Sequence, residues 1–275
     1  MKIKNYLLIG FFLLTLVGCE SREFIAERQM WHAHKMAQAI YKNPKGTPPF
    51  ELAKAQEEYK KIIKKYPDSL FGIQSQFSIG HLYLVMGDFQ KAREEYKKLN
   101  TNCDKRGNLC AEAIFAIGQS YELEDKWAQA LGQYKSILNA FPFSTKSLDL
   151  PIYIIRHYQR VKDGAAISRS CDEAVAYYGS LKAKTKSERG AYILDSLIAR
   201  SLIESGRWQE AVDFLEKIIA RYPKAGPDEA VMLKAVIYKN KLKDSSKAKE
   251  ELQRILRDYP NSKLTKQAKA FLNKL

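Results

Sequence analysis

The stretch GHLYLVMGDFQKAREEY, residues 80–96, contains the pattern that decides the fold. The pattern returns as GQSYELEDKWAQALGQY at 118–134 and as ARSLIESGRWQEAVDFL at 199–215. Each copy has a small residue three positions before a Tyr or Leu, then a turn with an aromatic residue, then an alanine four positions before a Tyr or Leu. Because several offsets recur together, we interpret the copies as one unit of two helices joined by a turn.

The alanine and the large residue that follows it recur along the chain. The pairs are Ala55/Tyr59, Ala92/Tyr96, Ala130/Tyr134, Ala174/Tyr178, Ala211/Leu215 and Ala248/Leu252. The alanines lie 37, 38, 44, 37 and 37 residues apart, a period typical of stacked helical units. The sequence therefore predicts an all-α fold, a right-handed α-solenoid of about six helix pairs, with a polar helix at 262–274 as its C-terminal cap.

Small residues predict where the two helices of a unit cross. Gly80, Gly118 and Ala199 let the second helix approach the first, and we expect the Tyr or Leu of the second helix to fill the gap to the next unit. Several units close on an aromatic residue and proline, which cannot continue a helix. These dipeptides are Tyr66-Pro67, Phe141-Pro142, Tyr222-Pro223 and Tyr259-Pro260. Ser69, Ser144 and Ser262 are expected to cap the helices that follow.

Two segments depart from the repeat. The first helix of the fourth unit is expected over 146–161, and 163–170 is interpreted as an insertion of about seven residues before a second helix that restarts near Cys171. The insertion is either a tolerated irregular turn or a binding loop. Residues 22–43 are expected to form one helix that supplies the missing first helix of unit one; a helix that docks elsewhere is the alternative.

The repeated residues resemble the signature of tetratricopeptide repeats, and the resemblance covers residues 50–275. It implies a concave groove, lined by the first helix of each pair, that binds a peptide or a partner helix. By register, the inward positions are Gln74, Phe77, His81, Phe115, Gln119, Glu122, Arg200, Ile203, Ile237 and Asn240. The alternative is that these side chains pack internally or are only solvated.

The N-terminus is expected to be an export signal. Lys2 and Lys4 precede the apolar run 7–17, which is too short to span a bilayer, so residues 1–18 are predicted to be a cleaved signal peptide. Residues 16–19, Leu-Val-Gly-Cys, resemble the lipobox of bacterial lipoproteins. The resemblance implies that Cys19 is the acylated mature N-terminus, carrying fatty acids such as palmitate. Residues 19–49 would then be the lipidated N-terminus and first helix, anchored to the outer membrane and facing the periplasm.

Charge and motifs argue against several functions. Removing residues 1–18 deletes two lysines and no acid, which leaves +13 of the +15 formal charge. The export signal argues against nucleic acid as a partner, so we expect at most weak electrostatic contact with anionic lipid or cell wall. His32 and His34 would diverge on a helix, and no metalloprotease, phosphate-loop or nucleophile-elbow motif occurs. We therefore expect no enzyme, no cofactor and no metal site.

Three cysteines remain after Cys19. Cys103 and Cys110 bracket a polar loop, and the oxidising periplasm would favour a local disulfide between them. Closing so short a loop should contribute roughly 2.5 kcal/mol at most. Cys171 has no partner nearby in the sequence and is expected to be a small buried residue.

A lipobox followed by repeats with Tyr-Pro-x-Ser turns resembles BamD-type lipoproteins of the outer-membrane β-barrel assembly machinery. The resemblance implies a periplasmic scaffold that binds other envelope proteins. One alternative is an adaptor of the Tol–Pal/CpoB kind in envelope constriction or peptidoglycan synthesis. Another is an accessory subunit of an envelope enzyme.

Overall fold

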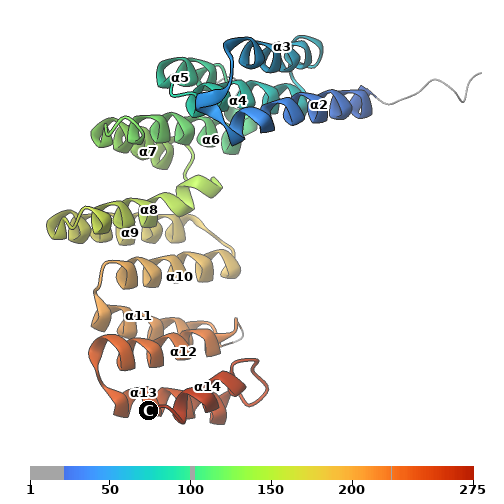
Figure 1. The fold of residues 1–275 in the computed structure, drawn as a ribbon. Coiled ribbons are helices and arrows are strands. Elements are labelled where there is room, and N and C mark those ends of the chain that lie inside the picture. Colours follow the sequence, from blue (N-terminus) through green and yellow to red (C-terminus); the bar gives the residue numbers. More distant parts are fainter. Residues whose placement is uncertain (1–21, 100–102, 224) are drawn as a thin grey trace, which may run out of the picture. The chain divides into compact units, whose positions relative to one another are not determined.

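The computed structural model describes residues 22–99, 103–223 and 225–275, without the side chains of residues 22 and 103–105 (Figure 1). The predicted signal peptide and Cys19 lie outside these residues. The described part contains thirteen α-helices and no strand. They are α2 (Arg22–Lys42), α3 (Pro49–Lys65), α4 (Leu70–Val85), α5 (Phe89–Lys97), α6 (Cys103–Glu122), α7 (Trp127–Ala140), α8 (Thr145–Arg160), α9 (Gly164–Lys184), α10 (Glu188–Glu204), α11 (Trp208–Arg221), α12 (Pro227–Ile237), α13 (Ser245–Asp258) and α14 (Thr265–Leu272).

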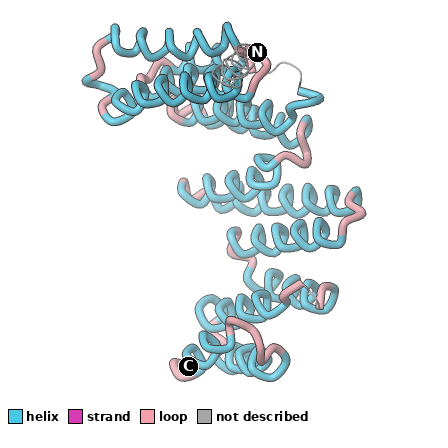
Figure 2. The backbone as a smooth tube through the Cα atoms, turned by 90° about the vertical axis from the view of Figure 1, so that its right-hand side faces the viewer, coloured by secondary structure: helices cyan, strands magenta, loops and turns pink. Residues whose placement is uncertain are grey.

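The helices follow one another in pairs, as Figure 2 shows for the backbone. The six pairs are α2/α3, α4/α5, α6/α7, α8/α9, α10/α11 and α12/α13, with α14 after the last pair. The predicted fold class is therefore confirmed, while the handedness of the stack stays a prediction. The chain divides into two compact units, residues 1–137 and 138–275, and each is described by itself. No helix in the described residues is long and apolar enough to cross a membrane.

In unit 1, the tyrosines of the repeat pack directly against glycines. A Cβ added at Gly80 would lie 2.6 Å from the Tyr96 ring, and one added at Gly118 would lie 2.3 Å from the Tyr134 ring. Both rings are fully buried. The small residue of the first helix thus makes room for the tyrosine of its own second helix. The sequence analysis expected this tyrosine to fill only the gap to the next helix pair.

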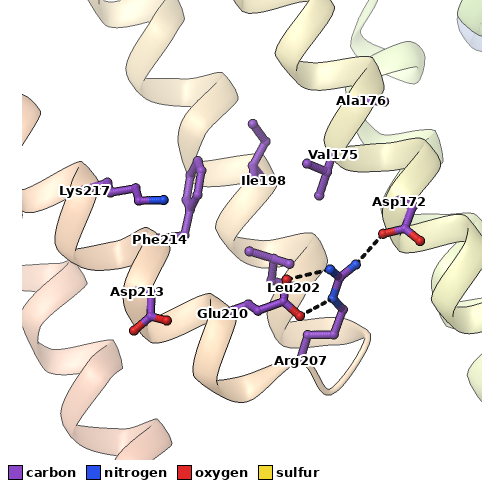
Figure 3. Close-up of a pocket in the computed structure, with 10 residues that line it drawn as sticks. All are labelled: Asp172, Val175, Ala176, Ile198, Leu202, Arg207, Glu210, Asp213, Phe214 and Lys217. Carbon is purple, nitrogen blue, oxygen red and sulfur yellow. Dashed lines mark hydrogen bonds and ion pairs between the residues drawn. The ribbon is translucent and has the colours of Figure 1, made fainter.

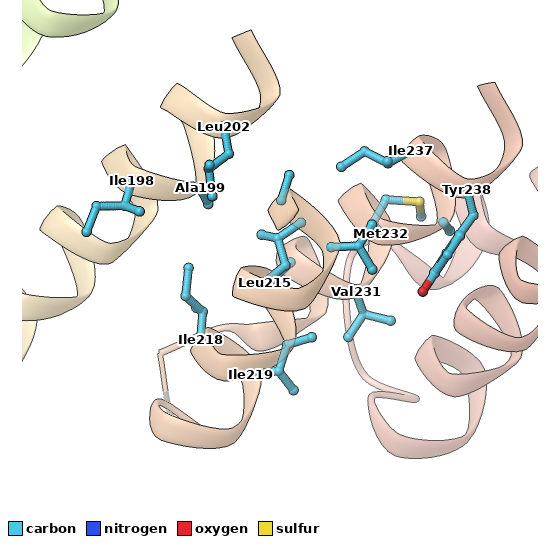
Figure 4. Packing of buried hydrophobic residues seen from close by; sticks show 14 of the residues in the cluster. Ile198, Ala199, Leu202, Leu215, Ile218, Ile219, Val231, Met232, Ile237 and Tyr238 are labelled. Atoms are coloured by element: carbon cyan, nitrogen blue, oxygen red, sulfur yellow. The ribbon is translucent and has the colours of Figure 1, made fainter. Parts of the chain in front are cut away.

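Unit 2 has one continuous core that joins α8–α14. Figure 4 shows Ile198 and Leu202 of α10, Leu215 and Ile218 of α11, and residues of α12 packed together. Ala248, Leu252 and Ile255 of α13 are completely buried in the same cluster. The alanine and the large residue of the repeat therefore belong to the core, because equivalent helices bury the same side in each helix pair.

The expected insertion at 163–170 is wrong. Helix α9 begins at Gly164 and runs for 21 residues, so these positions extend the helix rather than loop out of it. The Asp163 side chain accepts a hydrogen bond from the Ala166 N–H at 2.9 Å and caps the helix. Ala165, Ala166 and Ile167 can continue a helical turn, and this is why the segment is helical despite its glycine and serines.

Two of the three predicted serine caps are confirmed. The Ser69 hydroxyl accepts from the Gly72 N–H at 3.1 Å, and Ser144 accepts from the Ser147 N–H at 3.2 Å. Ser262 is not a helix cap: it accepts from the Leu264 N–H, but α14 starts only at Thr265. The C-terminal helix is accordingly shorter than predicted.

Candidate binding groove

A hollow lies on the first-helix side of unit 2, between α10 and α12, with α11 as its floor. We call it the α10–α12 groove, and its volume is about 390 Å³. It is lined by Tyr192, Ser196, Ala199, Arg200, Ile203 and Glu204 of α10, Leu215 and Ile218 of α11, and Glu229, Ala230 and Leu233 of α12.

The sequence of α10 explains how it serves both the core and the groove. Leu194, Ile198 and Leu202 recur every four residues and are buried. A second stripe, made of Tyr192, Ser196, Arg200 and Ile203, is centred about 155° away around the helix axis, at 100° per residue. One side of α10 therefore packs in the core, while the nearly opposite side lines the groove.

The groove combines apolar walls with charges at its edge. Leu233 keeps 38% of its surface exposed although apolar side chains surround it. Arg200 and Glu229 are exposed, and the Arg200 Nε lies 3.9 Å from the Glu204 carboxylate. An apolar hollow with a few charges at its rim suits one or two large side chains of a peptide or helix, with polar groups fixing the orientation.

Buried ionic contacts hold the walls of the groove. Asp195 is 1% exposed and receives Lys182 Nζ at 2.6 Å, the Tyr222 hydroxyl at 2.8 Å and Arg221 Nη1 at 3.1 Å. These partners tie α9, α10 and the end of α11 together. Burial, with the hydrogen bond to Asp195, raises the pKa of Tyr222.

A second buried charge lies on α12. Lys234 is 4% exposed and pairs with Glu216 of α11 and, at 2.6 Å, with Glu251 of α13. Burial would lower the pKa of Lys234, but its hydrogen bonds to the two carboxylates outweigh burial and raise it. Arg254 Nη1 binds Glu216 at 2.9 Å and, as the largest cause, lowers the pKa of that carboxyl.

The predicted groove residues of unit 2 divide into three groups. Arg200 and Ile203 line the α10–α12 groove. Asn240 is exposed in the π-helical turn Tyr238–Leu242 that follows α12. Ile237 is 3% exposed and belongs to the core, so it offers no surface to a partner.

In unit 1, the aromatic groove candidates pack against the repeat's own aromatic residues. The distance between ring centres is 5.0 Å for Phe77 and Tyr96, 5.1 Å for His81 and Tyr41, and 5.3 Å for Phe115 and Tyr134. Glu122 accepts a hydrogen bond from the Tyr134 hydroxyl at 2.8 Å. Gln74 and Gln119 are exposed. The aromatic candidates and Glu122 therefore pack internally, which is the alternative to lining a groove.

Sequence reasoning missed Tyr192, Ser196, Glu229 and Leu233. Tyr192 and Ser196 precede Arg200 by eight and four residues, so extending the register along the whole helix would have found them. Leu233 and Ile237 are also four apart, and no sequence signal distinguishes the exposed one from the buried one.

A second hollow lies between α9 and α11, and Figure 3 shows its lining. The Arg207 guanidinium binds Asp172 at 2.5 Å and Glu210 through two hydrogen bonds, at 2.5 and 2.7 Å. The bond to Glu210, followed by that to Asp172, raises the pKa of Arg207. The pairing of Arg207 with Asp172 joins the start of α11 to α9, and Val175 and Phe214 form part of the apolar wall of the hollow.

The cysteines differ in environment. Cys171 is buried with a free thiol, as predicted, and the Ser205 hydroxyl lies 3.1 Å from its sulfur. Cys110 is buried and disulfide-bonded. The side chain of Cys103 lies outside the described residues, so the Cys103–Cys110 pairing stays a prediction. Among the described side chains, no group of three or more His, Cys, Asp or Glu is arranged to hold a metal ion.

Comparison with known families identifies the repeats. The tetratricopeptide-repeat pattern matches residues 35–69, 112–144, 196–225 and 229–262. This chain contains tetratricopeptide repeats. The last two matches cover most of α10/α11 and α12/α13, so both tetratricopeptide repeats contribute a first helix to the α10–α12 groove.

Several solved structures resemble the chain at low sequence identity. A repeat protein from Parabacteroides merdae is 14% identical, covers 84% of this chain and 78% of its own, and has a TM-score of 0.40. PilW, a type IV pilus biogenesis factor, is 14% identical, with 87% and 96% covered and a TM-score of 0.40. A structure of nearly identical TPR-like repeats of a kinesin light chain from Podosopora anserina is 16% identical, with 72% of this chain and 97% of its own covered and a TM-score of 0.39. No curated protein matches the sequence.

Proposed function

We propose that this chain is a non-enzymatic scaffold that binds a segment of a partner protein in the α10–α12 groove. The observation that carries the proposal is the exposed Leu233 beside Ile203 in an apolar hollow with a charged rim. Buried leucine side chains contribute about 1.5–3 kcal/mol each, so leaving one exposed in a hollow favours an apolar occupant. The braced helices beneath it, tied through Asp195 and Lys234, keep the groove preorganised.

The cellular setting we propose is the bacterial envelope. The lipobox-like residues 16–19 support acylation at Cys19, an outer-membrane anchor and a periplasmic location. Together with the Tyr-Pro-x-Ser turns, they support a role like that of BamD-type lipoproteins in outer-membrane protein assembly. The partners would then be other envelope proteins.

The test is a crosslinked pull-down of the full-length protein from its own membranes, with partners identified by mass spectrometry. Recovery of β-barrel assembly subunits as the leading partners supports the BamD-like role. Recovery of Tol–Pal or cell-wall synthesis proteins in their place overturns it and assigns the scaffold to another envelope process.

A matched pair of variants tests the groove itself. Arg200→Glu with Leu233→Glu changes the rim and the apolar wall and should remove the leading partner. Lys249→Glu with Leu123→Glu makes the same change of charge and polarity at exposed positions outside the groove. Equal loss of the partner in both variants would contradict binding at the groove.

A further inference from the structure

The outer face of α2 is built differently from that of a solvated helix. Ala26, Ala33, Ala37 and Ile40 are buried along one side, against α3 and α4. At 100° per residue, the opposite side consists of one line. Its members are Phe24, Arg28, Trp31, Lys35 and Lys42. We call this line the α2 outer face; it spans about 27 Å at 1.5 Å per residue.

The α2 outer face presents large aromatic rings to solvent. Phe24 is 50% exposed and Trp31 is 63% exposed, although a helix packed on one side normally turns such residues inward. The Lys35 ammonium lies 5.3 Å from the centre of the Trp31 ring. The exposed rings and the cation thus form one surface feature rather than scattered side chains.

The charge on this face has one sign. Lys35 and Lys42 have no carboxylate within ion-pair distance among the described side chains, and no Asp or Glu falls in the line. The acids of α2, Glu23 and Glu27, are about 60–100° around the helix axis from Phe24. Basic residues interleaved with aromatic rings complement anionic headgroups, because aromatic rings favour the membrane–water interface and cations near it are attracted to the negative surface.

We infer that the α2 outer face lies against the surface of a membrane that contains anionic lipids. The inference rests on the anchoring part of the proposed function. Phe24 is five residues after Cys19, so the chain between them can span at most about 18 Å at 3.6 Å per residue. An acyl anchor at Cys19 therefore keeps α2 near the headgroups in any conformation of the connecting residues. Figure 1 shows α2 as the first described helix of unit 1.

The experiment uses Trp31 as a reporter. Trp127→Phe and Trp208→Phe leave it as the sole tryptophan of the full-length protein, which has three. The protein is reconstituted into vesicles of phosphatidylethanolamine and phosphatidylglycerol with brominated acyl chains, which quench tryptophan on contact. We expect loss of most of the Trp31 emission and a shift to shorter wavelength. A variant that keeps only Trp127, whose ring packs against Tyr134 within unit 1 and lies outside the α2 outer face, should lose less emission.

Charge reversal tests whether the α2 outer face contacts anionic lipid rather than another surface. Lys35→Glu with Lys42→Glu should restore the emission of Trp31, whereas Lys217→Glu with Lys249→Glu, at exposed positions of unit 2, should leave the quenching unchanged. Quenching that persists after reversal at α2, or that is equal in phosphatidylcholine vesicles, overturns the assignment to anionic lipid. So does a crosslinked dimer through α2 in the same sample.

An intact-mass measurement on the same sample keeps the two proposals distinguishable. An acylated protein whose Trp31 is not quenched overturns the α2 inference and leaves the anchor and the scaffold role in place. A protein without acyl chains whose Trp31 is not quenched overturns both the inference and the anchor. Binding at the α10–α12 groove is tested separately, by the pull-down with the Arg200→Glu and Leu233→Glu variant.

Discussion

At the scale of the residue, Asp195 is one of two buried charges in the described part of unit 2, with Lys234. Its carboxylate has lost almost all contact with water, and Lys182, Arg221 and Tyr222 replace that hydration. Lys182 and Arg221 keep contact with water, so the cost of removing the carboxylate comes mainly from its lost hydrogen bonds, above all the one from the buried Tyr222 hydroxyl. The same argument applies to Lys234, which has two carboxylate partners.

Asp195→Ala should lower the free energy of unfolding by about 1–3 kcal/mol, because the buried Tyr222 hydroxyl would lose its acceptor. Asp213→Ala is the control: Asp213 is exposed and accepts a hydrogen bond from Gln209, so the loss should stay within about 0.5 kcal/mol. Urea denaturation followed by circular dichroism measures both. Equal losses would show that the Asp195 cluster adds no stability.

Glu216 makes stability depend on pH. Its pKa is lowered in the folded protein, mainly by the hydrogen bond from Arg254, so it stabilises the fold fully above the ordinary glutamate pKa of about 4.3. This contribution is lost as the pH falls through the lowered value. Glu216→Gln should therefore be less stable than the unmodified protein at pH 7, and the difference should shrink below about pH 4.

Urea titrations between pH 7 and pH 3 measure that difference. The control is Glu250→Gln, at an exposed residue of α13 with no ion pair in the described part of the chain. Its difference from the unmodified protein should stay near zero at every pH. A Glu216→Gln difference that does not change with pH would contradict the proposed role of the carboxylate.

At the scale of the element, the turns inside five of the six pairs, all except α2/α3, follow one rule. Gly87, Asp125, Lys162, Gly206 and Lys243 all have positive φ, and each stands between the first and second helix of its pair. Asp88, Asp163 and Asp244 follow three of them and cap the next helix. Lys162-Asp163 thus corresponds to Gly87-Asp88, and this equivalence places the start of α9 at residue 164.

Two glycines, one in each helix of the α6/α7 pair, lead to a prediction at this scale. Gly118→Ala should destabilise the protein by about 1–3 kcal/mol, because the added Cβ collides with the Tyr134 ring. Gly132→Ala, in the partner helix α7, meets nothing within 4 Å and should stabilise the protein by about 0.5–1 kcal/mol. Thermal unfolding of both variants measures the two signs. A stabilising Gly118→Ala would contradict the close crossing of α6 and α7.

At the scale of the whole molecule, stacked helix pairs contact mainly their neighbours. Each unit has its own buried clusters, around Tyr59 and Tyr96 in unit 1 and around Leu215 and Leu252 in unit 2. In such arrays stability is nearly a sum of local contributions, because few contacts join distant repeats. Damage in one pair should therefore stay local.

Hydrogen exchange on the full-length protein tests this locality. Asp195→Ala should speed amide exchange in α9–α11, where its partners lie, and leave α2–α4 unchanged. Gly118→Ala serves as the reciprocal variant, with faster exchange around α6 and α7. A uniform increase along the chain in either variant would show that the protein opens as one cooperative body.

The sequence by itself determined the all-α fold, the order of the helix pairs and part of the groove. Period, small residues and proline are local signals, and each pair is built within about 40 residues. Arg200 and Ile203 could be placed for the same reason, since their side of α10 follows from the spacing of Leu194, Ile198 and Leu202. The start of α9 could also have been predicted, because Asp163 holds the same position before its helix as Asp88 and Asp244.

Only the tertiary structure decided which side chains at equivalent positions are buried. Leu233 and Ile237 share one face of α12, yet the core covers Ile237 and leaves Leu233 in the groove. Asp195 meets Lys182 and Tyr222 across separations of 13 and 27 residues, which no periodic pattern encodes. Burial and charge pairing depend on which helices meet in space, and spacing along one helix does not contain that information.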